Sequence, residues 1–173
     1  MCKDKEWTVA IEGPEVAGNQ GFVNTLCFPL SIFHYLAYMS DHLNISDFLS
    51  PVDLHEISHD EGYKDGQLGK TIVMYADEFP DLDEAQIVIV GCGEQRGSGL
   101  IHGQSQAPDI IRRHFYSLYY WHHDIKIADV GNIKTGSLFT DSYAALKTVV
   151  QELISDGKTV IILGGSHDLT LSQ

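Results

Sequence analysis

The chain has 173 residues, of which 43% are apolar; this suits one compact domain and excludes a disordered protein. Its formal net charge of −13 at pH 7 repels the phosphates of nucleic acids and anionic lipids, so we expect no nucleic-acid partner and no membrane partner. No apolar run approaches the ~18 residues that cross a bilayer, and neither an export signal nor a disulfide framework is visible, which favours a cytoplasmic protein.

Residues 1–85 are predicted to form a mostly helical amino-terminal extension packed against the rest of the chain. Within it, residues 31–39 and 45–49 fit short helices, and residues 70–75 fit either a strand or a helix. Between Asp41 and Glu84, twelve acidic residues stand against two lysines. Such a surface suits a cationic ligand, a divalent metal or a protein partner, although a solubilising face explains it more simply.

One segment of this extension matches a zinc-site pattern. His55-Glu56-Ile57-Ser58-His59 has the form H-E-x-x-H, in which two histidines one helical turn apart bind zinc and the glutamate acts as general base. Asp53, Asp60 and Glu61 place charge around this segment, whereas a zinc-binding helix is packed on its other sides. A solvated acidic helix or turn is therefore the favoured interpretation, and a zinc peptidase is kept as the lesser alternative.

Residues 86–173 alternate strands with helices. Each strand is a short run rich in β-branched residues, as expected for strands buried on both faces, and these runs are 86–90, 125–130 and 159–163. We expect Gly91 to close the first strand and Gly131 to end the second. A helix begins at Ala107, and Thr140 or Asp141 can cap a second one. The order predicts an α/β fold: a three-layer α/β/α sandwich with a mainly parallel sheet and an open edge after the third clear strand.

Each helix carries apolar residues at helical spacing that are expected to face the sheet. In the first helix these positions are Ile110, Ile111, His114, Phe115 and Leu118. In the second they are Leu146, Val149, Val150, Leu153 and Ile154, and Gly157 suits the left-handed exit. The aromatic residues after the first helix are expected to pack in the core and at the helix end; they are Tyr116, Tyr119, Tyr120 and Trp121.

The third strand is followed at once by Gly164-Gly165-Ser166-His167-Asp168. His167 lies four residues past Leu163, in the zone beyond the carboxyl ends of strands where open α/β sheets bind ligands. The two glycines let the backbone turn sharply, and a neutral imidazole there is able to bind a transition metal, with Asp168 as a ligand or a supporting group. On spacing alone, a helix cap or a hydrogen-bond donor in the core is an equally good account of His167.

Four segments, taken together and in order, resemble the ureohydrolase superfamily of arginase, agmatinase and formimidoylglutamase. They are the glycine-rich Gly91–Gly99, Ala107–Arg112, Asp129–Gly131 and Leu163–Thr170, the last of which is similar to the first metal motif of these enzymes. Ser166 precedes His167 and Asp168 follows it, whereas arginases usually have Asp before and Ser after. The resemblance covers roughly residues 86–173 and is closest to the formimidoylglutamase-like branch.

The resemblance implies a hydrolase that cleaves a guanidinium or formimino C–N bond in a small-molecule substrate. It implies two Mn²⁺ ions as cofactors, His167 as one metal ligand, and a possible homo-oligomer. The remaining ligands of the family lie in an Asp-x-His-x-Asp and an Asp-x-Asp segment after the first motif, and one histidine cannot hold two metal ions. We therefore expect the chain to be the first part of a longer enzyme, with its catalytic residues beyond Gln173.

Arg96 is the candidate substrate-binding residue, because a guanidinium can hold a substrate carboxylate through two parallel hydrogen bonds. A salt bridge that anchors its loop is the favoured alternative. Gly91-x-Gly93 after a strand is also similar to a dinucleotide loop, but Arg96 occupies the place of the third glycine in that pattern.

A function of a different class also stays open. The chain is compatible with a non-catalytic α/β module that binds a partner through the acidic extension, residues 1–85. Absence of manganese binding together with a stable monomeric fold would favour that alternative.

Overall fold

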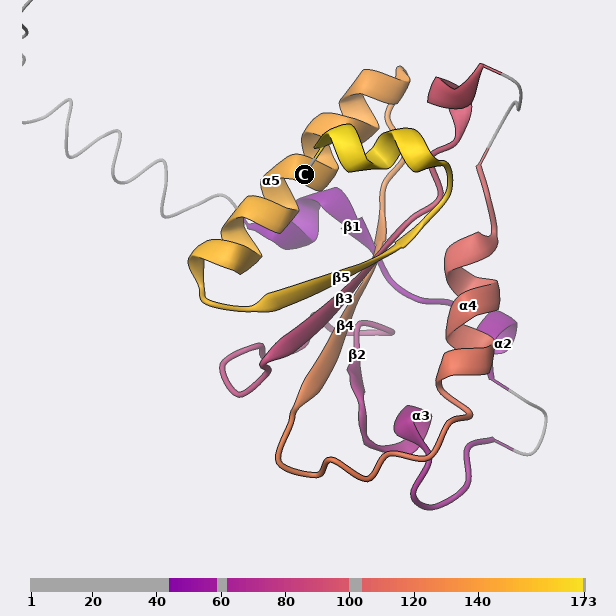
Figure 1. The fold of residues 1–173 in the computed structure, drawn as a ribbon, viewed down its shortest axis with the longest axis vertical. Helices are drawn as coiled ribbons and strands as arrows, with labels where there is room; N and C mark the ends of the chain where they lie inside the picture. Colours follow the sequence, from indigo (N-terminus) through magenta and orange to yellow (C-terminus); the bar gives the residue numbers. More distant parts are fainter. Residues whose placement is uncertain (1–43, 59–61, 100–103, 173) are drawn as a thin grey trace, which may run out of the picture. The chain divides into compact units, whose positions relative to one another are not determined.

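A five-stranded, mostly parallel sheet organises the part of the chain that the computed structural model describes, residues 44–58, 62–99 and 104–172 (Figure 1). Its strands are β1 (Leu49–Ser50), β2 (Val73–Met74), β3 (Ile87–Cys92), β4 (Ile127–Ile133) and β5 (Thr159–Gly164). Strand β3 lies between β4 and β5 and is parallel to both. The α/β fold with a mainly parallel sheet is therefore confirmed.

The helical elements occupy both faces of this sheet. They are η1 (Ile45–Phe48), α2 (Leu54–Ile57), α3 (Leu68–Thr71), η2 (Arg96–Ser98), α4 (Ala107–Phe115), α5 (Phe139–Ser155) and η3 (His167–Ser172). Successive side chains of β3 point to opposite faces, because a strand has a period of two. Val88 and Val90 join the core beneath α5, and Ile89 joins a second core with Tyr116 and Leu163 on the α4 face.

The three predicted strands are all present, but β3 and β4 continue past the glycines that were expected to end them. Gly91 lies inside β3, where a Cβ would collide with the Asn132 side chain of β4. Gly131 lies inside β4 with φ of 84°, a left-handed conformation that glycine adopts without steric penalty. The β3–β4 register shifts between Ile89 and Gly91, so these glycines accommodate an irregularity within the strands rather than a turn after them.

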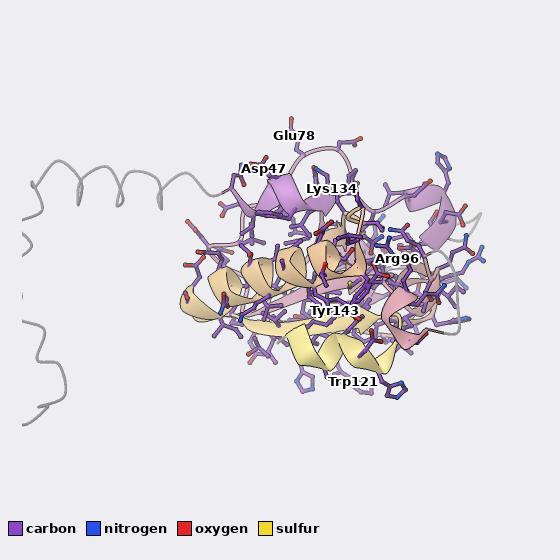
Figure 2. All side chains as sticks on the ribbon, turned by 90° about the horizontal axis from the view of Figure 1, so that it is seen from above. Asp47, Glu78, Arg96, Trp121, Lys134 and Tyr143 are labelled. Atoms are coloured by element: carbon purple, nitrogen blue, oxygen red, sulfur yellow. The ribbon has the colours of Figure 1, made fainter. Side chains whose placement is uncertain are left out.

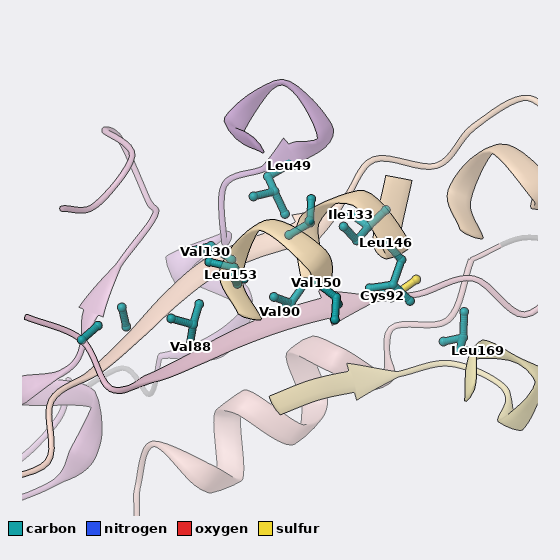
Figure 3. Packing of buried hydrophobic residues seen from close by; sticks show 13 residues of the cluster. Leu49, Val88, Val90, Cys92, Val130, Ile133, Leu146, Val150, Leu153 and Leu169 are labelled. Atoms are coloured by element: carbon teal, nitrogen blue, oxygen red, sulfur yellow. The ribbon is translucent and has the colours of Figure 1, made fainter. Parts of the chain in front are cut away.

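The core beneath α5 follows the predicted stripe closely (Figure 3). The predicted positions that are buried are Leu146, Val149, Val150 and Leu153. Ile154, the fifth predicted position, is 59% exposed, so its assignment to the core is wrong. Gly157 has φ of 75° directly after the helix, which confirms its predicted left-handed exit.

The predicted face of α4 is wrong at most of its positions, although Phe115 does pack in part against the core. Ile110 and Ile111 are 56% and 41% exposed, and Leu118 beyond the helix is also exposed. The residues of this segment that are buried are Pro108, Arg112 and Tyr116, which are spaced four apart. Hydrophobic periodicity could not find this face, because its central residue is an arginine whose charge is balanced by a carboxylate of the sheet. Of the four aromatic residues, Tyr116 is in the core and Tyr120 packs against it in part. Tyr119 is exposed, and so is Trp121, which is labelled in Figure 2.

Residues before β3 contribute to the same sheet. β1 pairs antiparallel with the end of β4, and β2 pairs parallel with its beginning. The short helix expected over 45–49 is the 3-10 helix η1, and segment 70–75 contains both alternatives, the end of α3 and then β2. The helix expected over 31–39 lies outside the described residues. Among the described helices, none combines the length and apolar character needed to span a membrane.

Candidate functional site at the carboxyl ends of the central strands

The loops after β3 and β5 lie side by side at the carboxyl ends of these adjacent parallel strands. The chain after β3 forms η2, which packs on η3, and then proceeds to α4, which packs on β3 and β5 from one face. The chain after β5 enters η3, which packs on α5 at the other face. Open α/β sheets bind ligands outside the carboxyl ends of their strands, so these loops form the candidate site.

His167 lies in the loop after β5. It is the first residue of η3 and follows the end of β5 by three residues, so its predicted position beyond the third strand is confirmed. Its side chain is exposed, and within the described residues it makes no hydrogen bond. An exposed imidazole at the carboxyl end of a central strand is available to bind a ligand.

Both neighbours of His167 are held in place. The backbone N–H of Ser166 donates to the carbonyl oxygen of Glu94 at 3.2 Å, and its hydroxyl oxygen lies 3.4 Å from the same carbonyl oxygen. Asp168 accepts hydrogen bonds from the Ser166 hydroxyl through Oδ1 and from the Tyr143 hydroxyl through Oδ2. Gly165 must be glycine for steric reasons, since an added Cβ would collide with the Glu94 carbonyl. The loop therefore carries a free imidazole between two anchored residues.

Glu94 and Arg96 form an ion pair beside this loop, and sequence analysis missed Glu94. Its residue is 2% exposed, and its carboxylate accepts from Nε of Arg96 at 2.9 Å and from Nη2 at 2.6 Å. The hydrogen bonds from Arg96, with further help from Ser142, lower the pKa of Glu94 to about 2 although burial opposes this. Arg96 also donates to the carbonyl oxygens of Gly136 and Ser137 at 2.9 and 3.0 Å. These are the contacts of a loop-anchoring arginine.

A second polar network lies under the start of α4, and it centres on the fully buried Arg112. Arg112 donates to Asp129 at 2.8 and 2.9 Å, Gly131 O at 2.9 Å, Asp109 at 2.8 Å and Asn132 at 2.5 Å. Tyr116 also donates its hydroxyl to Asp129. Burial alone would lower the pKa of Arg112, but the hydrogen bonds and charge of Asp129 outweigh it and raise that pKa. The network satisfies all five guanidinium N–H groups, so its role is structural.

A cavity of about 650 Å³ lies above this network, between the ends of β3 and β4. Gly93, Ser105, Asp109, Asn132 and Lys134 are among its lining residues. His167 and Asp168 do not line it, so the structure separates this cavity from the loop after β5.

The zinc-peptidase alternative requires His55 and His59 on consecutive turns of one helix. Helix α2 ends at Ile57, and Ser58 has an extended backbone with φ of −82° and ψ of 155°. The helix therefore stops before the second histidine, which lies outside the described residues. The Asp53 side chain caps this short helix by accepting from the His55 backbone N–H at 2.9 Å.

The described residues do not by themselves fit a binuclear metal centre. Across 44–58, 62–99 and 104–172, no group of three or more His, Cys, Asp or Glu side chains is placed to hold a metal ion. His167 is available, but both oxygens of Asp168 are engaged by Ser166 and Tyr143, and Glu94 is paired with Arg96. Two metal ions need several shared carboxylates, so these residues alone could not hold them.

Comparison with known proteins identifies a family for part of the chain. A model of the Arginase family matches residues 85–173, just over half of the chain. This range contains β3, β4, β5 and all four segments on which the ureohydrolase resemblance rests. No curated protein and no solved structure matches the chain.

Proposed function

Because the chain belongs to the arginase family, we propose that it carries the first metal-binding segment of a ureohydrolase that cleaves a guanidinium or formimino C–N bond. The placement of His167 carries this proposal: its exposed imidazole lies just beyond the carboxyl end of β5, between two anchored neighbours. Proteins of the family are generally Mn²⁺-dependent, and we assign His167 as one Mn²⁺ ligand.

Asp168 has a different role from that of His167 in this proposal. Its two carboxylate oxygens accept hydrogen bonds from Ser166 and Tyr143, so it holds the loop against α5. A fixed loop limits the positions that the imidazole samples, which lowers the entropy lost when the imidazole binds a metal ion. The remaining ligands of a binuclear centre would have to come from residues other than those described.

Within the family, we propose a formimidoylglutamase-like specificity, with arginase and agmatinase activity as alternatives. Support comes from the order Ser166-His167-Asp168 alone. Both flanking side chains are turned to anchoring contacts, so they affect substrate choice only through the position of His167. Incubation with a formimino compound, arginine and agmatine in turn would separate these activities, because the first releases formamide and the other two release urea.

The test of the proposed metal site compares His167→Ala with His122→Ala, which changes another exposed histidine far from β5 in the sequence. Mn²⁺ binding is measured from the electron paramagnetic resonance signal of the free ion, and hydrolysis is measured in parallel. We expect His167→Ala to weaken Mn²⁺ binding by about 100-fold and His122→Ala to leave it unchanged, since loss of even a supporting group at a metal site weakens binding 10–100-fold. Equal Mn²⁺ binding by both variants would rule out His167 as a ligand.

The second candidate function is a non-catalytic α/β module that binds a partner through the acidic residues of the extension. One observation favours it, namely that the described residues provide no three-ligand group. A stable monomer without Mn²⁺ binding supports this alternative, whereas a homo-oligomer that binds Mn²⁺ supports the hydrolase. We propose a cytoplasmic location in either case.

A further inference from the structure

We propose that Glu94 and Arg96 are positioning residues for His167, and that Arg96 does not bind substrate. We refer to this ion pair as the Glu94–Arg96 clasp. The proposal rests on the proposed function, because it assigns the clasp to the support of the metal-binding loop. Three observations carry it: the use of the Arg96 donors, the burial of Glu94, and a closed ring of contacts around His167.

The donors of Arg96 are already committed. Its Nε and Nη2 form the edge of the guanidinium that binds a carboxylate through two parallel hydrogen bonds. That edge holds Glu94, at 2.9 Å and 2.6 Å. The second N–H of Nη2 donates to Gly136 O at 2.9 Å, and Nη1 donates to Ser137 O at 3.0 Å. A substrate carboxylate could bind Arg96 in the same way only by displacing Glu94.

Displacing Glu94 is unfavourable because this side chain is almost fully buried. The residue is 2% exposed, whereas the Arg96 side chain is 27% exposed. Removing one partner of a buried pair leaves an uncompensated charge in the interior, which is strongly destabilising. Glu94 Oε1 also accepts the backbone N–H groups of Gln95 and Arg96 at 3.0 and 2.9 Å. The clasp therefore fixes the turn directly after β3.

From this turn, contacts lead to the residue before His167. The carbonyl oxygen of Glu94 accepts the Ser166 N–H, and Gly165 lies against the same carbonyl too closely for any side chain. A displacement of the Glu94 backbone would consequently displace the loop after β5.

Contacts from the clasp also lead to the residue after His167. Arg96 holds Gly136 and Ser137, which directly precede α5, and Tyr143 of α5 donates to Asp168. Gly97 lies where a Cβ would collide with both Asp168 and Tyr143. Arg96 and Tyr143 are both labelled in Figure 2. The contacts thus close a ring through the loops after β3, β4 and β5, and His167 lies within this ring with its side chain exposed.

The test uses the full chain without metal and substrate, and compares Arg96→Lys with Arg113→Lys. Lysine keeps the positive charge but cannot bind Glu94 and two carbonyl oxygens together. Arg113 is exposed on α4 and its side chain makes no hydrogen bond within the described residues, so it is a matched control. The main measurement is amide hydrogen exchange at Ser166, whose N–H donates to Glu94 O. We expect Arg96→Lys to accelerate exchange at Ser166 by about tenfold, because a factor of this size corresponds to the loss of one hydrogen bond to a charged group. We expect Arg113→Lys to leave the exchange rate at Ser166 unchanged.

The proposal also predicts where exchange does not change. Amides within β3 and β5 should exchange at the same rate in Arg96→Lys as in the original chain, because the clasp acts on the loops. An equal acceleration in the strands would show that the pair only stabilises the fold, and would overturn the proposal. Unchanged exchange at Ser166, combined with a higher KM and an unchanged kcat, would instead identify Arg96 as a substrate ligand. If Arg96→Lys does not fold, Glu94→Gln gives the same comparison, since glutamine keeps the side-chain size and the backbone carbonyl.

The exchange measurement needs neither hydrolysis nor metal binding, so its outcome is independent of the proposed function. If the protein proved not to depend on Mn²⁺, the clasp would have no metal-binding loop to support, but its expected effect on amide exchange at Ser166 would still hold. Conversely, a Mn²⁺-dependent hydrolase in which Arg96→Lys leaves Ser166 unaffected keeps its proposed function and loses the positioning role.

Discussion

Replacement of the buried Arg112 is expected to lower the free energy of unfolding through a single broken ion pair. In Arg112→Met, an unbranched apolar side chain of similar length replaces the guanidinium and leaves Asp129 fully buried without its cation. Asp129 then keeps two of its donors, the hydroxyl of Tyr116 and the N–H of Gly131. Breaking a buried ion pair costs about 3–5 kcal/mol, and these two donors favour the lower end, so we expect a loss of about 3 kcal/mol in the free energy of unfolding.

Urea denaturation is the assay, since the change in midpoint multiplied by the slope gives the loss in free energy. For a chain of this size, ~3 kcal/mol corresponds to a fall of about 6–12 °C in Tm. Arg113→Met makes the same chemical change at an exposed position of the same helix, and we expect it to remain within ~0.5 kcal/mol of the original chain.

A double variant tests the cause. Arg112→Met with Asp129→Asn removes both charges, and it should be more stable than Arg112→Met alone by ~1 kcal/mol or more, because residues in one network do not act additively. A loss below ~1 kcal/mol for Arg112→Met, or no recovery in the double variant, would refute the assignment of Arg112 as the buried partner of Asp129.

Three further predictions concern the loops and the helix faces. Gly165→Ala should destabilise the chain by about 1–3 kcal/mol in urea denaturation, because the added Cβ would collide with the Glu94 carbonyl. Gly164→Ala should cost less, because its Cβ would make only an ordinary contact with Leu169, and equal losses of stability in the two variants would contradict this. The pKa of Glu94 is lowered to about 2, so its contribution to stability is fully present above its ordinary value of 4.5 and is lost as the pH falls toward 2; Glu94→Gln should flatten the stability curve in that window, and an unchanged curve would count against the clasp. Ile110→Ser should change the free energy of unfolding by less than ~0.5 kcal/mol because Ile110 is exposed, whereas Leu146→Ala should lower it by about 2–5 kcal/mol because Leu146 is buried. A large loss of stability in Ile110→Ser would show that Ile110 belongs to the core.

The elements of the second half were predictable because their signals are local. Short β-branched runs identified β3, β4 and β5, and the apolar spacing of α5 identified four of its buried residues. The place of His167 followed from chain order, because a residue just after a parallel strand must lie at the carboxyl edge of the sheet. Gly91 and Gly131 were interpreted as strand ends, since a sequence does not show whether a glycine allows a turn or an irregular pairing within a sheet.

The polar contacts of the candidate site were not predictable in the same way. Arg112 is polar by any hydropathy scale, and it became a core residue only because Asp129, 17 residues later, meets it from the sheet. Glu94 carried a weak signal, an acidic residue soon after a buried strand, but its partners for anchoring the loops lie far along the chain. Ser166 hydrogen-bonds to it across 72 residues, and the clasp reaches Gly136 across 40.

The sequence by itself determined the class of fold, the order of the central strands along the chain and the place of His167 just beyond the third of them. These properties depend on spacing over a few residues, and the arginase-family match covers the same part of the chain, residues 85–173. The tertiary structure alone decided that Arg96 holds Glu94, that α4 buries an arginine, and that β1 and β2 join the sheet. Each of these depends on which distant groups meet once the sheet has assembled, because a buried charge or an unpaired strand edge is stable only where its partner arrives.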